Sequence, residues 1–152
     1  MRRRPILAGM VIALGWLLVA AAAEAVEKGP DGKIVMRLAH SSPAGNPTDT
    51  AAKKWAELLK ERTGGKLEVR VFPNEQLGSE KACLEGAVLG TIDVSLNDAA
   101  YVADLYPAAG VFDFPFTFRD WGHYAAMLKD PIFPEVAGLV EKEVGTKTLG
   151  LW

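Results

Sequence analysis

Between residues 34 and 96 the sequence alternates between short apolar runs and segments with helical periodicity. Ile34–Ala39, Lys66–Phe72 and Ile92–Leu96 have the length and composition of strands. Apolar and charged residues alternate along Lys66–Phe72, which predicts a half-exposed strand near a sheet edge. Three strands separated by two helices within about 60 residues are typical of βαβ units with right-handed crossovers. The sequence therefore predicts an α/β fold with a mainly parallel sheet flanked by helices.

Helix-start residues precede both intervening segments. Asn46 and Pro47 are typical of a helix start, and apolar residues then recur at three- and four-residue steps, so we expect a helix over Pro47–Arg62. Ser79 has the chemistry of an N-cap for the second helix, which Gly90 ends. Cys83 falls within this second helix, and its expected role is that of a small buried hydrophobe.

The pattern changes after Leu96. The segment Tyr106–Phe118 is rich in aromatic residues and contains Pro115, and we expect it to be buried and extended. Two helices should follow, over about 120–128 and 134–144. The last residues, 147–152, are typical of the start of a further strand. Because domains usually end in exposed, uncommitted residues, we expect the protein to continue beyond this point.

Residues 1–25 have the organisation of a secretory signal peptide. Three arginines precede a mostly apolar stretch that ends in the small-residue pattern Ala23-Glu24-Ala25. A retained membrane anchor is the alternative, because about 18 apolar residues can just span a hydrocarbon core. No charged stop-transfer cluster follows, which favours cleavage and a flexible mature N-terminus over residues 26–33. The sequence predicts export to the periplasm without stable membrane insertion, by a route that stays open because the twin-arginine motif is incomplete.

Composition and motifs exclude several classes of function. After residue 25 the chain has 14 basic and 18 acidic residues and no basic runs, so nucleic acid is not an expected partner. The single cysteine permits no intrachain disulfide, and His40 and His123 are too far apart in the sequence to suggest a metal site. The sequence contains no glycine-rich phosphate-binding loop and so gives no indication of a cofactor. Ser41 and Ser42 beside His40 lack a G-x-S-x-G elbow, so we expect no hydrolase activity.

Polar residues follow the first and third predicted strands. His40, Ser41 and Ser42 come directly after the first, and Asn97 and Asp98 after the third. Ligands of open α/β sheets bind beyond the carboxyl ends of the strands. The free N–H groups at the start of the first helix would also suit a carboxylate. These residues therefore form the candidate binding site, although each could equally serve only to satisfy the backbone of a turn.

Four blocks occur in an order and spacing that resemble a known family. They are Leu38–Pro43, Phe72–Glu80, Gly90–Asp93 and Phe112–Asp120. Together they look like the N-terminal portion of the solute-binding subunit of tripartite ATP-independent periplasmic (TRAP) transporters, of the dicarboxylate-binding, DctP-type family. The resemblance covers about residues 34–152.

The resemblance implies a periplasmic-binding-protein type II-like fold, with residues 34–152 as the first lobe of a two-lobe clamp. The second lobe, whose arginines would hold a ligand carboxylate, would lie beyond Trp152. Such proteins are not enzymes and need no cofactor. They capture a small organic acid, C4-dicarboxylate-like or another carboxylate, and deliver it to a membrane permease.

The resemblance also implies roles for individual residues. His40, Ser41, Asn97 and Asp98 are similar in position to first-lobe contacts of the family, and Trp152 falls at the first crossing between lobes. Gln76 and Glu80 are expected to shape a turn and a helix start rather than to contact the ligand. Two alternatives remain: a binding subunit of an ATP-driven importer with the same fold, and an exported α/β hydrolase.

Overall fold

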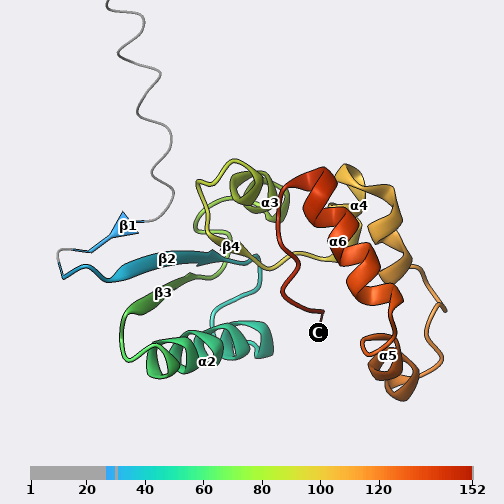
Figure 1. Cartoon of the computed structure of the whole chain (residues 1–152), viewed down its shortest axis with the longest axis horizontal. Coiled ribbons are helices and arrows are strands. Elements are labelled where there is room, and N and C mark those ends of the chain that lie inside the picture. Colours follow the sequence, from blue (N-terminus) through green and yellow to red (C-terminus); the bar gives the residue numbers. More distant parts are fainter. Residues whose placement is uncertain (1–26, 30, 152) are drawn as a thin grey trace, which may run out of the picture.

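The computed structural model describes residues 27–29 and 31–151, which contain one four-stranded sheet. Its central strand, β2 (Ile34–Ala39), pairs in parallel along its whole length with β3 (Leu67–Phe72). The opposite edge of β2 is shared by two short strands. At its start, β1 (Glu27–Lys28) pairs antiparallel, and at its end β4 (Val94–Ser95) pairs parallel (Figure 1). The expected α/β class and mainly parallel sheet are confirmed.

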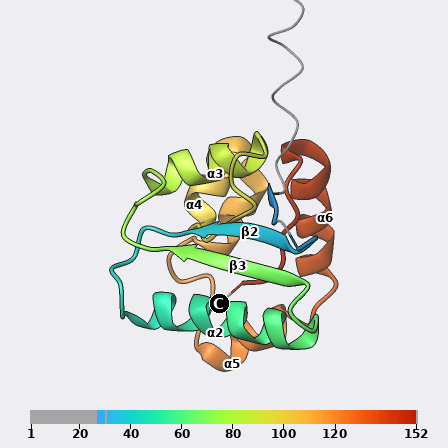
Figure 2. The same cartoon turned by 90° about the vertical axis from the view of Figure 1, so that its left-hand side faces the viewer.

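Helices cover both sides of this sheet. α2 (Pro47–Arg62) lies on one side, and α3 (Glu80–Val88) lies on the other together with α4 (Ala99–Leu105) (Figure 2). The side chain of Asn46 caps α2 by accepting a hydrogen bond from the Asp49 N–H at 2.9 Å. Ser79 caps α3 in the same way. Both predicted helices are confirmed, because their starts rest on local cap chemistry.

The last third of the described chain is helical. A 3₁₀-helix, η1 (Pro107–Phe112), follows α4, and then come α5 (Trp121–Met127) and α6 (Ile132–Val144). These helices lie beside the sheet rather than on it, at the right of Figure 1. Both expected helices of this part are confirmed, although α6 begins two residues before the predicted Pro134 because proline is tolerated in a first helical turn. No helix among the described residues has the length and apolarity needed to cross a bilayer.

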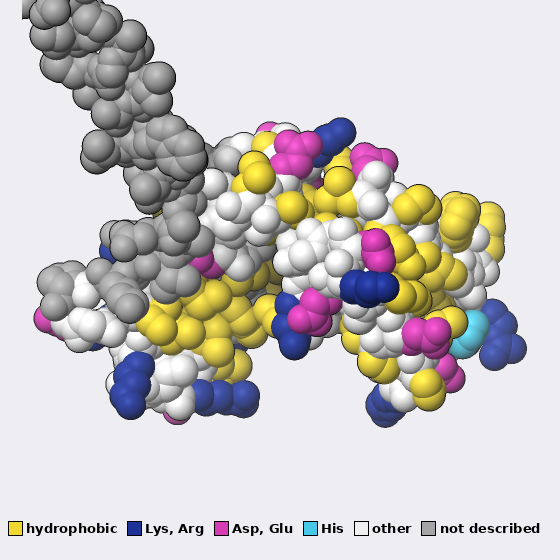
Figure 3. Space-filling model, turned by 45° about the horizontal axis from the view of Figure 1, so that its top comes forward, with side chains coloured by type: hydrophobic (Ala, Val, Ile, Leu, Met, Phe, Trp, Pro, Cys, Tyr) yellow, Lys and Arg dark blue, Asp and Glu magenta, His cyan; other side chains and the backbone are white. Residues whose placement is uncertain are grey.

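The expectation for residues 106–118 is wrong. Instead of a buried, extended segment the structure has η1 followed by turns, and Phe114 and Phe116 are 68% and 100% exposed. Hydrophobic side chains occupy much of the visible surface of this helical part (Figure 3). Pro107 occupies a first helical position, where its missing N–H costs nothing. The alternation of aromatic residues therefore does not reflect a strand.

Three other expectations need correction. Only Val94–Ser95 of the predicted strand 92–96 is a strand, because β4 pairs with β2 only at Leu38 and Ala39. Among residues 147–151 no strand is formed. Conversely, β1 lies within residues 26–33, which the sequence indicated only as a flexible segment, and α4 was not expected at all.

Asp93 joins β4 to the central strand. Its carboxylate accepts a hydrogen bond from the Arg37 N–H at 2.7 Å, and its own N–H donates to the Arg37 carbonyl at 3.2 Å. Just beyond β4, the Leu96 N–H donates to the Ala39 carbonyl. These bonds extend the two-residue pairing in both directions. They fix the place where the chain leaves β4, beside the end of β2.

A small core lies between the sheet and α3. Ala39, Cys83 and Ile92 are buried there and Leu77 packs against them. Burial raises the pKa of the Cys83 thiol, and the nearby carboxylates of Glu75 and Glu80 add to this effect. A buried thiol with a raised pKa is a poor nucleophile, so the predicted structural role of Cys83 is confirmed.

Candidate functional site

A cavity of about 120 Å³ lies at the carboxyl ends of β2 and β4. Its walls come from the loop after β2, the first turns of α2 and α3, and the segment after β4. The lining residues are His40, Ser41, Ser42, Thr48, Glu80, Leu96, Asn97 and Asp98. Five of the six predicted site residues are therefore brought together. The sixth, Trp152, lies outside the described residues.

The loop after β3 supports the cavity from behind. The N–H groups of Asn74 and Glu75 donate to the carbonyls of Ser42 and His40, at 2.9 and 3.3 Å. Asn74 and Glu75 both adopt left-handed backbone conformations, with φ of 56° and 57°. Such conformations cost energy in residues other than glycine. The tight turn they form holds the first cavity loop through its backbone.

Glu80 connects the two loops that flank the cavity. Its Oε2 accepts a hydrogen bond from the Ser41 hydroxyl at 3.0 Å, and its Oε1 accepts one from the Asp98 N–H. The sequence indicated only a role at the helix start, but the structure also places this carboxylate on the cavity wall. Its position in the first turn of a helix, just after a strand and loop, is the signal that could have identified it.

The cavity wall carries several hydrogen-bond acceptors. Asn97 donates its amide hydrogen to the Ser95 hydroxyl at 2.6 Å, whereas its Oδ1 is buried and has no hydrogen-bond partner among the described residues. Glu80 and Asp98 add two carboxylates. A buried acceptor without a partner is costly. This wall is therefore complementary to a molecule that brings hydroxyl donors.

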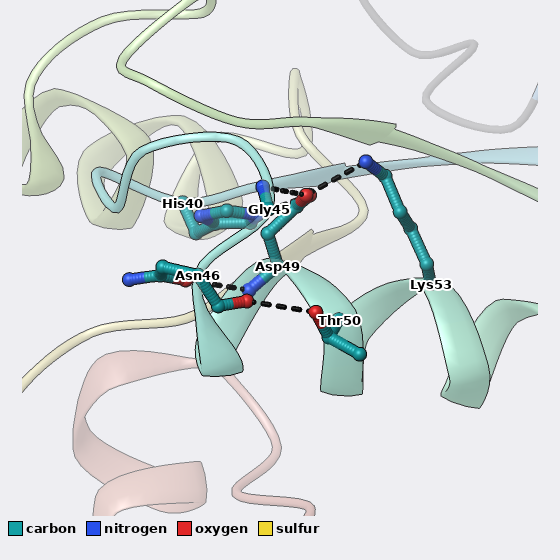
Figure 4. A network of polar contacts seen from close by, with 6 residues as sticks. All are labelled: His40, Gly45, Asn46, Asp49, Thr50 and Lys53. Atoms are coloured by element: carbon teal, nitrogen blue, oxygen red, sulfur yellow. Dashed lines mark hydrogen bonds and ion pairs between the residues drawn. The ribbon is translucent and has the colours of Figure 1, made fainter.

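A buried polar network lies behind the cavity (Figure 4). The Oδ2 of Asp49 accepts hydrogen bonds from the Gly45 N–H at 2.6 Å and from the Lys53 Nζ at 2.7 Å. The Nε2 of His40 lies 3.4 Å from the Oδ1 of the same carboxylate. The bond from Lys53 is the main cause that lowers the pKa of Asp49, followed by the bond from Gly45, while burial acts in the opposite direction. The carboxylate is therefore charged at neutral pH.

The sequence predicted a seat for a ligand carboxylate at the start of α2. Asn46 already caps the N–H of Asp49, and the fully buried side chain of Asp49 places a negative charge at this helix end. A ligand carboxylate brought to the same place would meet a like charge at short range. The chain's own carboxylate thus occupies part of this helix start, and a ligand carboxylate at this position stays a prediction.

A second, wider depression of about 360 Å³ lies on the helical part. It is lined by Phe112, Phe118, Asp120, Trp121 and Tyr124. Its walls are mainly aromatic, and none of them comes from a strand end. Within residues 27–29 and 31–151, no three His, Cys, Asp or Glu side chains come together in a way that could hold a metal ion. The polar cavity at the strand ends is therefore the stronger candidate site.

A mainly parallel sheet flanked by helices, with a small polar cavity at its strand ends, is the arrangement in which open α/β proteins bind ligands. The particular family follows from sequence comparison. The chain belongs to the bacterial extracellular solute-binding protein family 7 (DctP), whose family model matches residues 38–152. The resemblance inferred from the four sequence blocks is confirmed.

Relatives of known name agree with this family. The 2,3-diketo-L-gulonate-binding periplasmic protein YiaO of Escherichia coli is 32% identical over 117 residues, which is 77% of this chain and 35% of the relative. The chain thus spans about a third of that relative's length.

Solved structures of TRAP periplasmic solute-binding proteins share the fold. One from Xanthobacter autotrophicus, with bound β-D-galacturonate, is 36% identical, with a TM-score of 0.66 over 71% of this chain and 36% of its own. Another from Sulfurospirillum deleyianum, with bound succinate, is 28% identical, with a TM-score of 0.63 over 71% of this chain and 35% of its own.

Proposed function

We propose that the chain forms one lobe of a periplasmic TRAP solute-binding protein that captures a hydroxylated organic acid and delivers it to a membrane permease. The observation that carries the solute class is the acceptor-rich cavity wall at the ends of β2 and β4. Hydroxyl groups of a sugar acid would supply the donors that this wall needs. Residues 1–25 would direct export as a cleavable signal peptide.

The negative charges around the cavity indicate that the two ends of the solute bind in different places. The cavity wall carries Glu80 and Asp98, no lining residue is a lysine or arginine, and the buried Asp49 lies behind the wall. A ligand carboxylate would be repelled here. We therefore place the hydroxylated end in this cavity and the carboxylate against cationic side chains outside the described lobe. Closure of two lobes on such a solute would be driven by its additional contacts in the closed state.

The relatives support a sugar acid over a simple dicarboxylate. Their names include binders of galacturonate and of diketogulonate as well as of succinate. Fully ionised succinate has no hydrogen-bond donor and would leave the Asn97 Oδ1 unsatisfied. Galacturonate carries several hydroxyl donors. The protein would bind and release its solute unchanged, because the cavity offers no activated nucleophile.

A titration followed by NMR tests the proposal. Galacturonate added to the ¹⁵N-labelled chain should shift the amide resonances of Ser41, Ser42, Asn97 and Asp98, whereas succinate at equal concentration should not. Comparable shifts with succinate, or none with either solute, would contradict the proposed solute class.

Substitution of Glu80 refines the test. Glu80→Gln should weaken galacturonate binding roughly tenfold or more, because hydrogen bonds to charged groups contribute about 1.5–3 kcal/mol. Glu85→Gln, the same change at an exposed position of α3, is the control and should leave affinity unchanged. Equal affinities of the two variants would show that the Glu80 carboxylate does not organise the cavity.

A further inference from the structure

One contact between the loop after β2 and helix α2 joins two fully buried polar side chains. His40 follows β2 and Asp49 lies in the first turn of α2, and each side chain is 1% exposed. Burying a charged carboxylate is costly unless its oxygens find partners. The partners of the two Asp49 oxygens therefore restrict which ring nitrogen of His40 carries a hydrogen.

The two oxygens of Asp49 are used unequally. Oδ2 accepts from both the Gly45 N–H and the Lys53 Nζ. Oδ1 has no hydrogen-bond partner among the described residues, and the nitrogen it faces is the His40 Nε2, 3.4 Å away. Nε2 is also without a hydrogen-bond partner among the described residues, so the two atoms face each other at slightly more than hydrogen-bond distance. A hydrogen on Nε2 would make this approach attractive, whereas a bare Nε2 would oppose the lone pairs of the oxygen. The carboxylate thus selects the protonated form of Nε2.

When Nε2 of His40 carries the hydrogen, the other ring nitrogen, Nδ1, is left as an acceptor. The Nδ1 of His40 is also buried and without a hydrogen-bond partner among residues 27–29 and 31–151, and the ring lines the cavity. In neutral histidine one nitrogen donates and the other accepts, and the partner of one fixes the state of the other. Lys53 already balances the charge of Asp49, so this carboxylate does not require a second cation.

We propose that Asp49 is a positioning residue for solute binding: it keeps the ring hydrogen of His40 on Nε2 and leaves Nδ1 as an acceptor for a solute hydroxyl. The inference rests on the proposed function for its solute and adds one acceptor to the cavity wall. Asp49 acts on the solute only through His40, since Asp49 is not among the residues that line the cavity.

The tautomer of His40 can be measured without any solute. In the ¹⁵N-histidine-labelled chain, two-bond ¹H–¹⁵N spectra should give the neutral His40 ring a protonated-type shift at Nε2 and an unprotonated-type shift at Nδ1. The spectra are recorded across pH so that the neutral form is observed. A neutral ring with its hydrogen on Nδ1 would overturn the proposal, and this measurement needs no variant.

Asp49→Asn should invert the tautomer. The amide oxygen would keep the donors Gly45 and Lys53, and the amide NH₂ would face Nε2, which must then accept; the hydrogen moves to Nδ1, as in catalytic triads whose aspartate is replaced by asparagine. Galacturonate affinity should fall roughly tenfold or more, because an acceptor of the cavity becomes a donor. An unchanged tautomer in a folded variant would contradict the proposal.

Thr50→Ala is the matched control. It removes the hydrogen bond from the Thr50 hydroxyl to the Asn46 carbonyl in the same helical turn and should change neither tautomer nor affinity. The outcomes also separate the two proposals. Binding of galacturonate with the hydrogen on Nδ1 would refute the role of Asp49 alone, whereas the expected tautomer without any binding would refute the proposed function.

Discussion

The lowered pKa of Asp49 makes stability depend on pH in a direction that the structure fixes. A carboxyl group whose pKa is lower in the folded than in the unfolded chain stabilises the fold above its unfolded pKa, about 3.9 for aspartate. This contribution is lost as the pH falls through the folded value. The hydrogen bond from Lys53 is the largest cause of the lowered pKa, and the Gly45 N–H adds to it.

Urea unfolding at several pH values tests this coupling. The wild-type chain should lose stability as the pH falls from neutral to below about 4. Asp49→Asn should be less stable at pH 7 and should lose less on acidification, so the two curves converge in acid. Lys53→Met removes the main cause of the shift and should reduce the pH dependence in the same direction. A constant gap between wild type and Asp49→Asn would contradict the assignment.

Residue patterns predicted the cavity better than the network behind it. His40, Ser41, Asn97 and Asp98 could be found because residues after parallel strands meet at one sheet edge. The carboxylate of Glu80, by contrast, accepts hydrogen bonds from two residues that lie 39 and 18 positions away in the sequence. Such contacts depend on how far α3 stands from the sheet, which no local pattern contains.

Asp49 was missed for a related reason. An acidic residue in a first helical turn is common because it interacts favourably with the helix dipole, so its presence there indicates nothing further. The sequence has no feature that shows its side chain turning back to Gly45 and His40.

Among the elements, α3 can pack closely against the core because Gly86 has no side chain. A Cβ atom on Gly86 would lie 2.9 Å from the Ile92 Cδ1 and 3.1 Å from the Thr91 Oγ1. Ile92 is itself buried in the core, so it has little room to move. The close approach of α3 to the 91–92 turn therefore requires glycine.

The same substitution at two helical glycines should have opposite effects. Gly86→Ala should destabilise the chain by about 1–3 kcal/mol through overpacking. This cost exceeds the stabilisation expected from the higher helix propensity of alanine. Gly138→Ala, in α6 with no atom within 4 Å of the new Cβ, should stabilise it by about 1 kcal/mol. Urea midpoints measure both, and a higher midpoint for Gly86→Ala would show that α3 stands further from the core.

Elements with strong local signals were predictable and those without them were not. α2 was predicted to the residue because Asn46, Pro47 and a helical apolar face agree. β1 has only two residues, and its strand character comes from its pairing with β2. The aromatic residues of 106–118 favoured a buried, extended segment, but the chain forms a short 3₁₀-helix that begins at Pro107. Tertiary contacts decided these segments.

At the scale of the whole molecule, burial is uneven. Among the described residues, most of the buried hydrophobic side chains lie in the part that forms the sheet with α2 and α3: Val35, Leu38, Ala39, Ala52, Cys83, Leu84 and Ile92. The helical part after Asp98 contributes Ala109 and Val140, and α5 has no buried residue. The helical part exposes large aromatic side chains instead, such as Trp121 at 79%. The two parts therefore contribute unequally to stability.

This imbalance should appear in native-state hydrogen exchange. Amides open locally with a free energy that follows the buried contacts around them. The amides that β2 and β3 direct toward each other lie in a six-residue parallel ladder covered by α2, so they should exchange only through global unfolding, with protection equal to the unfolding free energy. The amides of α5 should exchange at least tenfold faster, through local opening of a helix without buried residues. Gly138→Ala should raise protection in α6, and also in β2 through the larger unfolding free energy, while leaving the local opening of α5 unchanged. If α5 exchanged as slowly as β2, the helical part would belong to the same cooperative unit as the sheet, and its exposed aromatic surface would have to be stabilised by contacts other than those within this lobe.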